Sequence, residues 1–461
     1  MKTMHFDVIV IGAGSGLNIS SIASRSGLKV ALIEKGPMGG TCLNRGCIPS
    51  KLLIHHADIV ETISRADEFG IYVPQPKIHF SSIVKKTSQI VDNDAQSIEQ
   101  GIREDKNITL FKGLGKFISK KTFFVNNTTI SGDKIFIVAG VRPFIPPIKG
   151  IENISYLTST EALRIKRQPP HITFIGGGYI AAELAHFYGS LGSKVTIIQR
   201  NELLIPHEDG EIAKKFTQIF SQKYNVFLSY QTLEVKKKGR VIKVTIQKKD
   251  EKGPLKTIQT DDLVIAAGII PNSDLLDVKK TGIHVTEEGF IKVNEYLETN
   301  VKGIWALGDI IGKYIFKHSA NLEAEYAIQN AFTTKKKKVD YSAMPHAIFT
   351  SPQIAGVGFT EDRLKNKNIP YTVGRYRYSD TGMGLALRDK EGFVKILVHK
   401  KTRKILGCHI LGTNASTLIH EVIVAMKSGK GLIDNLTHAV HIHPALSEVV
   451  QRAAYSALRF K

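Results

Sequence analysis

Apolar residues in this chain fall into short runs that end in glycine-rich turns. Residues 6–11 form one such run, interrupted only by Asp7, and residues 172–175 form another. Each run is followed by a glycine turn and then by a segment of small residues, an order that predicts a strand, a turn and a helix. Second strands are predicted at residues 29–33 and 194–198. The pattern therefore indicates two separate βαβ openings of the α/β class.

The C-terminal part of the chain has a different pattern. The apolar runs at residues 393–398 and 405–410 predict strands, whereas residues 415–428 and 447–459 predict helices. Residues 113–117 are expected to begin a further sheet that returns to the first unit. No apolar run approaches the roughly 20 residues that span a bilayer, and no signal-peptide pattern precedes the first strand. We therefore expect a cytoplasmic protein that does not enter a membrane.

The first glycine turn has the spacing of a dinucleotide-binding fingerprint. It contains Gly12, Gly14 and Gly16, but Leu17 stands where a further glycine is usual. The glycines that are present allow the backbone to approach a pyrophosphate at the start of the helix. Glu34 ends the next predicted strand, roughly 20 residues after the first glycine, where a carboxylate can meet a ribose 2′-hydroxyl. This turn therefore predicts a dinucleotide site.

The second glycine turn repeats the fingerprint with one change in the following strand. Gly176 and Gly178 take the glycine positions, and small Ala181 stands where helix and strand must touch. The next strand ends on Gln199 and Arg200 rather than on an acidic residue. A carboxylate there would repel a 2′-phosphate, whereas an arginine can pair with it. The second site is therefore predicted to bind NAD or NADP, with NADPH favoured, unless Arg200 is simply a solvated side chain.

Two cysteines lie shortly after the first predicted βαβ segment. Cys42 and Cys47 have four residues between them, and Gly46 and Pro49 supply turn and stop signals that bring such a pair together. The pair could be a structural bridge, two buried thiols or a disulfide that opens and closes. Only three cysteines occur in 461 residues, which fits a reducing compartment and a catalytic dithiol. Cys408 lies in an apolar run and is expected to be an inert core residue.

The order of these motifs resembles the flavoprotein disulfide reductases over essentially the full length of the chain. Beyond the fingerprints, the matching segments are residues 39–51, 138–143, 266–272, 299–309 and 441–448. The resemblance implies bound FAD, a nicotinamide nucleotide, and a Cys42–Cys47 disulfide that exchanges an electron pair with a small disulfide or dithiol. It also implies a homodimer and an oxidoreductase that acts on a sulfur group.

The resemblance assigns roles to the residues around the flavin. Cys42 corresponds to the thiol that exchanges with substrate, and Cys47 to the thiol that lies against the flavin and donates charge to it. Lys51 and Glu183 resemble the buried pair beside the flavin N5, where neither charge is tolerable without the other. An imidazolium near Cys42 would lower the pKa of its thiol and so activate it.

His443 and Glu448 are the predicted acid and base. A proton must move on and off sulfur during the exchange, and an imidazole with a near-neutral pKa suits that step. Glu448 would orient the ring and stabilise its charged form. His441 is the competing candidate, but the family motif is a histidine immediately before proline. Because the family forms its dimer through the C-terminal part, His443 and Glu448 are expected to reach Cys42 of the other subunit.

The same resemblance assigns the remaining cofactor contacts. Asp309, in a Gly-Asp pair, is expected to face the ribityl chain. The residues expected to contact FAD are Gly12, Gly14, Gly16, Glu34, Gly40, Thr41, Lys51, Gly115, Ala139, Gly140, Asp309 and Ala320. Those expected to contact the nicotinamide nucleotide are Gly176, Gly178, Ala181, Glu183, Arg200 and Gly268. No metal site is assigned.

These motifs predict an α/β protein with two Rossmann-like dinucleotide-binding domains and a C-terminal α+β dimerisation domain. The FAD domain is expected to take residues 1–148 and to recover residues 272–340. The NAD(P) domain is expected at residues 149–271, and the dimerisation domain at residues 341–461.

The chain is strongly basic. Its 63 Lys and Arg against 42 Asp and Glu give a formal net charge of +21. Lysine clusters occur at residues 236–240 and 335–338, in segments predicted as hairpin turns or linkers, and no nucleic-acid module surrounds them. We therefore expect a solvated basic surface, with an acidic partner as the alternative, and no nucleic-acid ligand.

The substrate is open within the family. The chain ends without the cysteine pair of mercuric and large thioredoxin reductases, and the helix at residues 17–25 is mostly neutral. These features favour lipoamide, and hence dihydrolipoamide dehydrogenase, with a lipoyl-bearing multienzyme complex as a candidate partner. However, residues 317–324 resemble mycothione reductases and Arg200 favours NADPH. A NADPH-dependent reductase of mycothione or glutathione disulfide is therefore the alternative. A flavin NAD(P)H oxidase or transhydrogenase, or a binding protein that uses the basic surface, is a further one.

Overall fold

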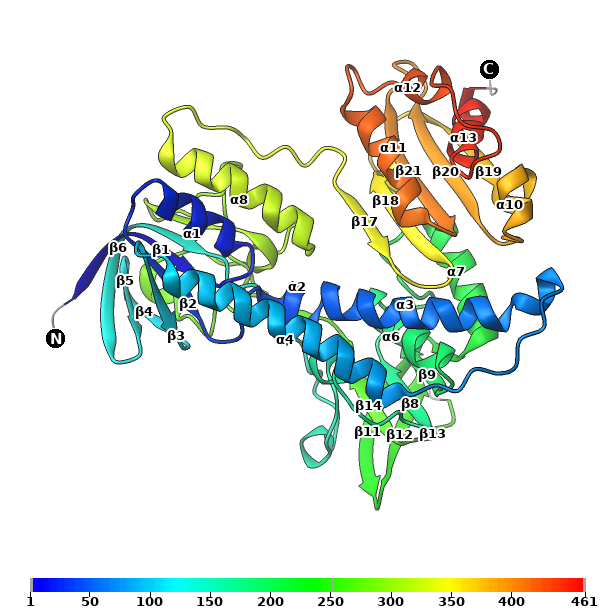
Figure 1. Cartoon of the computed structure of the whole chain (residues 1–461), viewed down its shortest axis with the longest axis horizontal. Helices are drawn as coiled ribbons and strands as arrows, with labels where there is room; N and C mark the ends of the chain where they lie inside the picture. Colours follow the sequence, from blue (N-terminus) through cyan, green and yellow to red (C-terminus); the bar gives the residue numbers. More distant parts are fainter. Residues whose placement is uncertain (1–2, 251–252, 459–461) are drawn as a thin grey trace.

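The computed structural model describes residues 3–250 and 253–458. Figure 1 shows a first unit around β1 and β2, a second unit around β8 and β9, and a C-terminal sheet beside them. The α/β class predicted from the sequence is confirmed by parallel sheets in the first two units and an antiparallel sheet in the third.

The first sheet is parallel at its centre and antiparallel at one edge, in the order β3-β2-β1-β6-β5-β4, with β16 also paired to β6. Val10 of β1 lies opposite Leu32 of β2, so both strands end at the edge where the glycine turn begins. All of β2 is buried, as expected for a parallel strand covered on both faces. The strands are Met4–Ile11 (β1), Val30–Glu34 (β2), Ile108–Lys112 (β3), Lys116–Ser119 (β4), Thr122–Val125 (β5), Thr128–Ile137 (β6) and Ile304–Ala306 (β16). The helices of this unit are Gly16–Arg25 (α1), Gly40–Arg45 (α2), Cys47–Ser64 (α3), Phe80–Glu104 (α4) and Lys317–Phe332 (α8).

The second unit repeats the strand, turn and helix of the first. Its parallel sheet has the order β10-β9-β8-β14, and an antiparallel sheet β11-β12-β13 lies beside it. The strands are His171–Ile175 (β8), Lys194–Gln199 (β9), Asn225–Leu228 (β10), Tyr230–Lys238 (β11), Val241–Lys248 (β12), Lys256–Thr260 (β13) and Asp262–Ile265 (β14). The helices are Ser159–Ala162 (α5), Tyr179–Ser190 (α6) and Gly210–Lys223 (α7). The chain enters through β7 (Val141–Pro143) and leaves through β15 (Ile269–Pro271), which pair antiparallel at the crossing.

The C-terminal sheet is antiparallel, in the order β17-β18-β21-β20-β19. The α11 helix packs on β18 and β21, and α13 packs on β19 and β20. The strands are Pro345–Ile348 (β17), Gln353–Gly358 (β18), Tyr371–Arg377 (β19), Phe393–His399 (β20) and Ile405–Gly412 (β21). The helices are Glu361–Asn366 (α9), Gly382–Ala386 (α10), Ala415–Lys427 (α11), Asp434–Thr437 (α12) and Glu448–Leu458 (α13).

The long helices α3 and α4 connect the first two units, and Figure 1 shows both running from the first sheet past α6. The α4 helix buries Phe80, Val84, Val91 and Ala95, a spacing that places them on one helical face. Phe80 and Val84 share one apolar core with residues of α3 and α6. The start of α3 is therefore held against the second unit.

Most predicted elements are confirmed with small shifts at their ends. The strand predicted at 29–33 begins at Val30, and the helix predicted at 447–459 begins at Glu448, while its predicted end at Arg459 lies outside the described residues. The strand expected near 113–117 begins only at Lys116, after two glycines. Most of the lysine cluster at 236–240 lies at the end of β11 rather than in the turn. Over the described residues, no helix is both long and apolar enough to cross a membrane.

Candidate active site

The two cysteines lie on either side of a break between helices. Cys42 is in α2, and Cys47 is the first residue of α3, with Gly46 between the helices. The buried Asn44 fixes this turn, because its side-chain nitrogen donates to the carbonyl oxygens of Met38 at 2.7 Å and Gly40 at 2.9 Å. Both cysteines are free thiols here, which corresponds to the reduced form of the predicted pair.

The two thiols differ in charge. A hydrogen bond from Cys42 lowers the pKa of Cys47 to about 7, and the nearby Lys51 ammonium acts in the same direction. The pKa of Cys42 is raised, first because its thiol donates that hydrogen bond and second because it is partly buried. Cys47 also starts a long helix, whose dipole favours a negative charge there. The negative charge of the reduced pair therefore resides on Cys47.

One helical turn after Cys47, Lys51 forms an ion pair with the second unit. Its Nζ lies 2.8 Å from the Glu183 carboxylate on α6, and the Glu183 side chain is 9 % exposed. Glu183 also accepts a hydrogen bond from the backbone nitrogen of Phe349 at 3.0 Å. The Lys51 ammonium lies 4.6 Å from the centre of the Phe349 ring. Nothing in the sequence pattern pointed to Phe349, which comes from the C-terminal unit.

Four predicted FAD-binding residues line a single cavity at the edge of the first sheet: Gly12, Glu34, Gly115 and Ala139. Glu34 is buried, and its carboxylate accepts hydrogen bonds from the backbone nitrogens of Ala13 at 2.8 Å and Gly36 at 2.7 Å. The carboxylate therefore lies directly beside the glycine turn.

The first glycine turn excludes a side chain at one glycine and leaves open space at another. Gly12 has a positive φ of 108°, and a Cβ there would lie 2.4 Å from the carbonyl oxygen of Val138. At Gly14, in contrast, a Cβ would meet only the Cα of Gly40, at 3.9 Å. The turn thus combines a tight backbone with open space, as a pyrophosphate requires. FAD fits these residues.

The second turn has the same geometry. Gly176 has a φ of 116°, and a Cβ there would lie 2.2 Å from the carbonyl oxygen of Ala266, whereas a Cβ at Gly178 would meet nothing within 4 Å. Ala181 is fully buried in α6. Arg200 follows the end of β9 and is exposed. A nicotinamide nucleotide therefore fits the second turn as FAD fits the first.

A lysine that motif reasoning did not assign to the site lies between the first turn and the thiols. Lys317 begins α8, and its Nζ donates to the Ser15 hydroxyl at 3.0 Å. Its charge lowers the pKa of both Cys42 and Asp309. Burial nevertheless raises the pKa of Asp309 to about 6. The only sequence signal for Lys317 was its place in the 317–324 segment.

The two histidines near the C-terminus differ in exposure. The Nδ1 of His443 lies 3.1 Å from each oxygen of Glu448, and its side chain is 76 % exposed. His441 instead pairs with Glu421 at 2.9 Å and is 7 % exposed. His443 thus keeps its other ring nitrogen free for solvent or a substrate. Within one chain His443 is not brought to Cys42, because α13 lies at the far end of the C-terminal unit from α2 (Figure 1).

The other predicted residues surround these groups. Gly40 packs against Gly14, and its neighbour Thr41 is exposed on α2. Ala320, on α8, is buried next to Gly308, the residue before Asp309. Three predicted residues remain: Gly16 packs on Val10, and Gly140 and Gly268 flank the crossing of β7 and β15.

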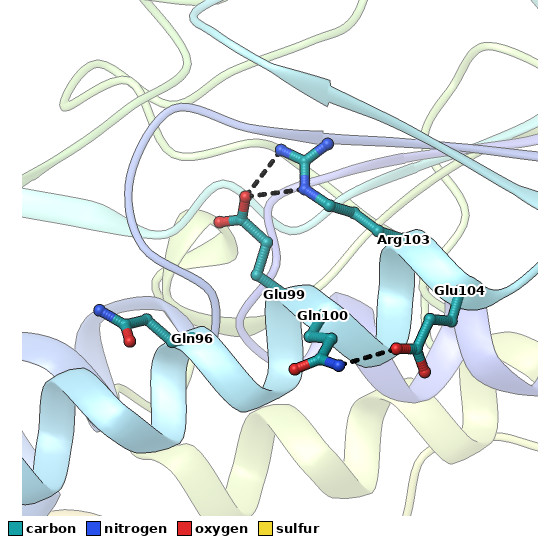
Figure 2. Close-up of a pocket in the computed structure, with 5 residues that line it drawn as sticks. All are labelled: Gln96, Glu99, Gln100, Arg103 and Glu104. Atoms are coloured by element: carbon teal, nitrogen blue, oxygen red, sulfur yellow. Dashed lines mark hydrogen bonds and ion pairs between the residues drawn. The ribbon is translucent and has the colours of Figure 1, made fainter.

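A separate hollow lies on the outer face of α4 (Figure 2). Its charged and amide groups pair with each other, Arg103 with Glu99 at 2.7 Å and Gln100 with Glu104 at 2.8 Å. It contains none of the predicted site residues. Over the described residues, no group of three or more His, Cys, Asp or Glu is arranged to hold a metal.

Comparison with known families supports this geometry. A family described as "Pyridine nucleotide-disulphide oxidoreductase" matches residues 6–331, and its dimerisation domain matches residues 344–454. The chain belongs to this family. Members are FAD-dependent oxidoreductases that bind NAD(P) and contain a redox-active disulfide.

Several relatives align over nearly the whole chain. A mycothione reductase of Mycobacterium tuberculosis (strain CDC 1551 / Oshkosh) is 34 % identical and covers 97 % of this chain and 98 % of its own length. Dihydrolipoyl dehydrogenase 1, a mitochondrial protein of Arabidopsis thaliana, is also 34 % identical and covers 97 % and 89 %. The solved structure of HOCl-induced flavoprotein disulfide reductase RclA from Escherichia coli has a TM-score of 0.86 at 26 % identity, covering 99 % of this chain and 100 % of that one. The recognition of the family from sequence is therefore confirmed.

Proposed function

We propose that this protein moves an electron pair between a nicotinamide nucleotide and a small uncharged disulfide of the lipoamide type, so that it is a dihydrolipoamide dehydrogenase. The main support is the arrangement of α3, which begins at Cys47 and presents Lys51 to Glu183 of the second unit at 2.8 Å. One helix thereby connects the dithiol to the nicotinamide-binding unit.

Each residue has a distinct task in this proposal. When bound, FAD would accept a hydride from the nicotinamide and pass the electron pair to sulfur. Glu34 and the glycine turn would hold its adenosine and pyrophosphate, and Asp309 its ribityl chain. Lys51 and Glu183 would keep a compensated charge pair at the point of hydride entry. Cys47 would carry the thiolate that faces the flavin.

The substrate end uses Cys42 and the histidine. His443 would take the proton of the Cys42 thiol, and the Cys42 sulfur would attack one sulfur of a disulfide substrate, forming a mixed disulfide and releasing the other sulfur as a thiolate. His443 would protonate that leaving sulfur, and Cys47 would then attack Cys42 to release the second thiol. Glu448 would hold the His443 ring and stabilise its charged form.

Apart from the half-buried Lys317, Arg45 and the side chains of α1 favour an uncharged substrate. Arg45, which could have charged the entrance, points away, because its Nη2 would lie 3.2 Å from a Cβ on Gly36, beside Glu34. Its buried Nε has no hydrogen-bond partner. The exposed residues of α1 before its last are neutral, among them Asn18 and Ile22. A disulfide without carboxylates therefore suits this approach.

A second candidate is a NADPH-dependent reductase of a low-molecular-weight disulfide such as that of mycothiol. The observation in its favour is the end of β9, where Gln199 replaces a carboxylate and exposed Arg200 follows. The alignment with a mycothione reductase over 97 % of the chain supports the same candidate.

The remaining proposals concern organisation. We infer an FAD domain from residues 1–148 and 272–340, an NAD(P) domain from 149–271 and a C-terminal domain from 341–461. The matched dimerisation domain supports a homodimer in which each subunit supplies His443 to the other's Cys42. A cytoplasmic location and contact with a lipoyl-bearing complex follow from the lipoamide proposal.

Steady-state assays test these alternatives. Lipoamide, glutathione disulfide and mycothiol disulfide should each be assayed with NADH and with NADPH, and lipoamide should give the highest kcat/KM. If lipoamide gives the lowest value, the first proposal is wrong. The Cys42→Ser variant serves as the control, because it should lose all disulfide turnover. Oxidation of the nicotinamide that persists in this variant without any disulfide substrate would instead indicate an oxidase or transhydrogenase.

A further inference from the structure

The helices α3 and α6 are joined by more than the Lys51–Glu183 pair. Two further polar contacts follow along the same interface. The Nε2 of His186 lies 2.8 Å from Asp58, and the hydroxyl of Ser190 donates to Glu61 at 2.9 Å. Together the three contacts form a ladder, which we name the α3–α6 ladder.

The spacing of these residues explains why they meet. Glu183, His186 and Ser190 lie three and seven residues apart on α6, so they share one helical face. On α3, Lys51 and Asp58 are also seven residues apart. Each residue of the ladder therefore helps to set the position of the next, and Glu183 lies at one end of the series.

His186 is the central member and is completely buried, with a side-chain exposure of 0 %. Its Nδ1 contacts the Ser190 hydroxyl at 3.2 Å and lies 3.6 Å from Glu61. From α7, Lys223 pairs with Glu61, and the half-buried Tyr224 lies nearby. Burial alone would lower the pKa of His186, but the carboxylates of Asp58 and Glu61 raise it above its ordinary value of 6.5.

We propose that protonated His186 is a positioning residue that holds α6 against α3 and thereby fixes Glu183 beside Lys51. This inference rests on the proposed function, in which that pair marks the point of hydride entry. It deepens that function because it makes the nicotinamide half of the reaction depend on a buried imidazolium. The α6 members of the ladder lie about 130 residues from their α3 partners in the sequence.

The direction of the pH effect follows from the ion pair. A buried imidazolium paired with carboxylates stabilises the folded arrangement fully below its ordinary pKa of 6.5. That stabilisation is lost as the pH rises through the higher folded-state pKa. Flavin reduction by NADPH should therefore slow on the alkaline side, whereas reoxidation by the disulfide substrate should not share this dependence.

Anaerobic stopped-flow absorbance of the holoenzyme tests the proposal between about pH 6 and about pH 9. The His186→Gln variant keeps a side chain that can hydrogen bond to Asp58 but cannot become charged. At about pH 6 it should reduce flavin about tenfold more slowly than the wild type, and its profile should lose the alkaline transition. Its NADPH dissociation constant and its reoxidation by lipoamide should stay within about twofold of wild type.

Two further variants sharpen the test. Asp58→Asn removes the negative charge that pairs with His186, at a side chain that is 42 % exposed. This variant should also slow flavin reduction, as His186→Gln does. His171→Gln is the matched control, because His171 begins β8 in the same unit and bonds to Thr196 of β9 at 2.9 Å, outside the ladder. It should follow the wild-type profile.

The outcome separates this inference from the proposed function. If His186→Gln and Asp58→Asn both reduce flavin at the wild-type rate with the wild-type pH dependence, His186 does not position Glu183. If Glu183→Gln leaves flavin reduction unchanged, the proposed role of the pair fails instead. The ladder is then judged by thermal unfolding, where the wild-type Tm should fall more than that of His186→Gln between about pH 6 and about pH 9.

Discussion

At the scale of single residues, the reduced dithiol is controlled by two lysines on different helices. Lys51 acts on Cys47, the thiol of lower pKa, while Lys317 acts on Cys42 from the start of α8. Each ammonium lowers the pKa of the thiol that it approaches. The two lysines thus oppose the effect of burial at either end of the pair.

Replacing Lys317 should make Cys42 less reactive. In Lys317→Gln the positive charge is lost, so the pKa of Cys42 rises and less thiolate is present at any pH. We expect alkylation of Cys42 by iodoacetamide, followed on its own peptide by mass spectrometry, to slow by about three- to tenfold near neutral pH. Lys313→Gln, a neighbouring lysine that lies over the Tyr341 ring, is the control and should alkylate as wild type does. Equal rates in all three proteins would contradict a role for Lys317.

Replacing Asp309 should stabilise the apoprotein but weaken its binding of FAD. Burial raises its pKa to about 6, so the apoprotein loses stability as the pH rises from the ordinary value of 3.8 through that value. Asp309→Asn should therefore raise the Tm of the apoprotein at about pH 8, and the gain should vanish near pH 4. The same variant should bind FAD about tenfold more weakly, as measured by flavin fluorescence. An unchanged FAD affinity would remove Asp309 from the proposed site.

Motif position identified the residues that pair across the site, but not the residues that support them. Lys51 and Glu183 each lie in a recognisable motif, and so do His443 and Glu448. Phe349 contacts Glu183 from 166 residues away, and no spacing rule links two such positions. The sequence could not predict this contact because it depends on how separate units pack.

At the scale of elements, the same division holds. The strands that lead into the glycine turns, β1 and β8, were predictable because most of their residues are apolar and a glycine follows each of them. The β4 strand begins later than expected because glycines disfavour a strand interior. The contact between α7 and the C-terminal sheet has no local signal at all. It depends on a buried lysine in β20.

That lysine, Lys395, should contribute strongly to stability. Its side chain is 2 % exposed, and its Nζ lies 2.7 Å from both Asp209 and Glu361. Lys395→Met would leave the fully buried Asp209 uncompensated, which we expect to destabilise the protein by about 3 to 5 kcal/mol in thermal or denaturant unfolding. Lys365→Met removes an exposed partner of the same Glu361 and should cost less than about 1 kcal/mol.

The pH dependence of this effect has a defined sign. Burial would raise the pKa of Glu361, but its hydrogen bond with Lys395 lowers it to about 2. The stabilisation is therefore present above the ordinary pKa of 4.5 and is lost as the pH falls toward 2. The difference between wild type and Lys395→Met should shrink over that range. A constant difference would mean that the ion pair is not its cause.

At the scale of the whole molecule, one chain does not bring its proposed acid and base, His443 and Glu448, to the proposed active dithiol. His443 is largely exposed, and α13 lies away from α2 (Figure 1). The family resemblance predicted that the two halves of the site come from different subunits, and the arrangement of the units within one chain agrees with that prediction. A second subunit would bring them together, as the proposed homodimer requires.

Hybrid dimers provide a direct test of site sharing. In a dimer of one Cys42→Ser subunit and one His443→Ala subunit, one shared site would contain both substitutions and the other would contain neither. Such hybrids should recover about half of the wild-type turnover, although each parent dimer is nearly inactive. If instead each site were formed by a single chain, both sites of the hybrid would contain one substitution and the hybrid would regain no activity. Co-purification with two different affinity tags isolates the hybrid for the assay.

Because Cys408 in β21 is fully buried, the number of reactive thiols in the native protein reports the redox state of the Cys42–Cys47 pair. A thiol reagent added to the native protein should reach only the partly exposed Cys42 and Cys47, since the remaining cysteine of the chain, Cys408, is buried inside the C-terminal core. A colorimetric count should therefore read two thiols per chain after reduction and none after oxidation, with one more after denaturation. The stoichiometry of this simple titration would report directly whether the pair has closed.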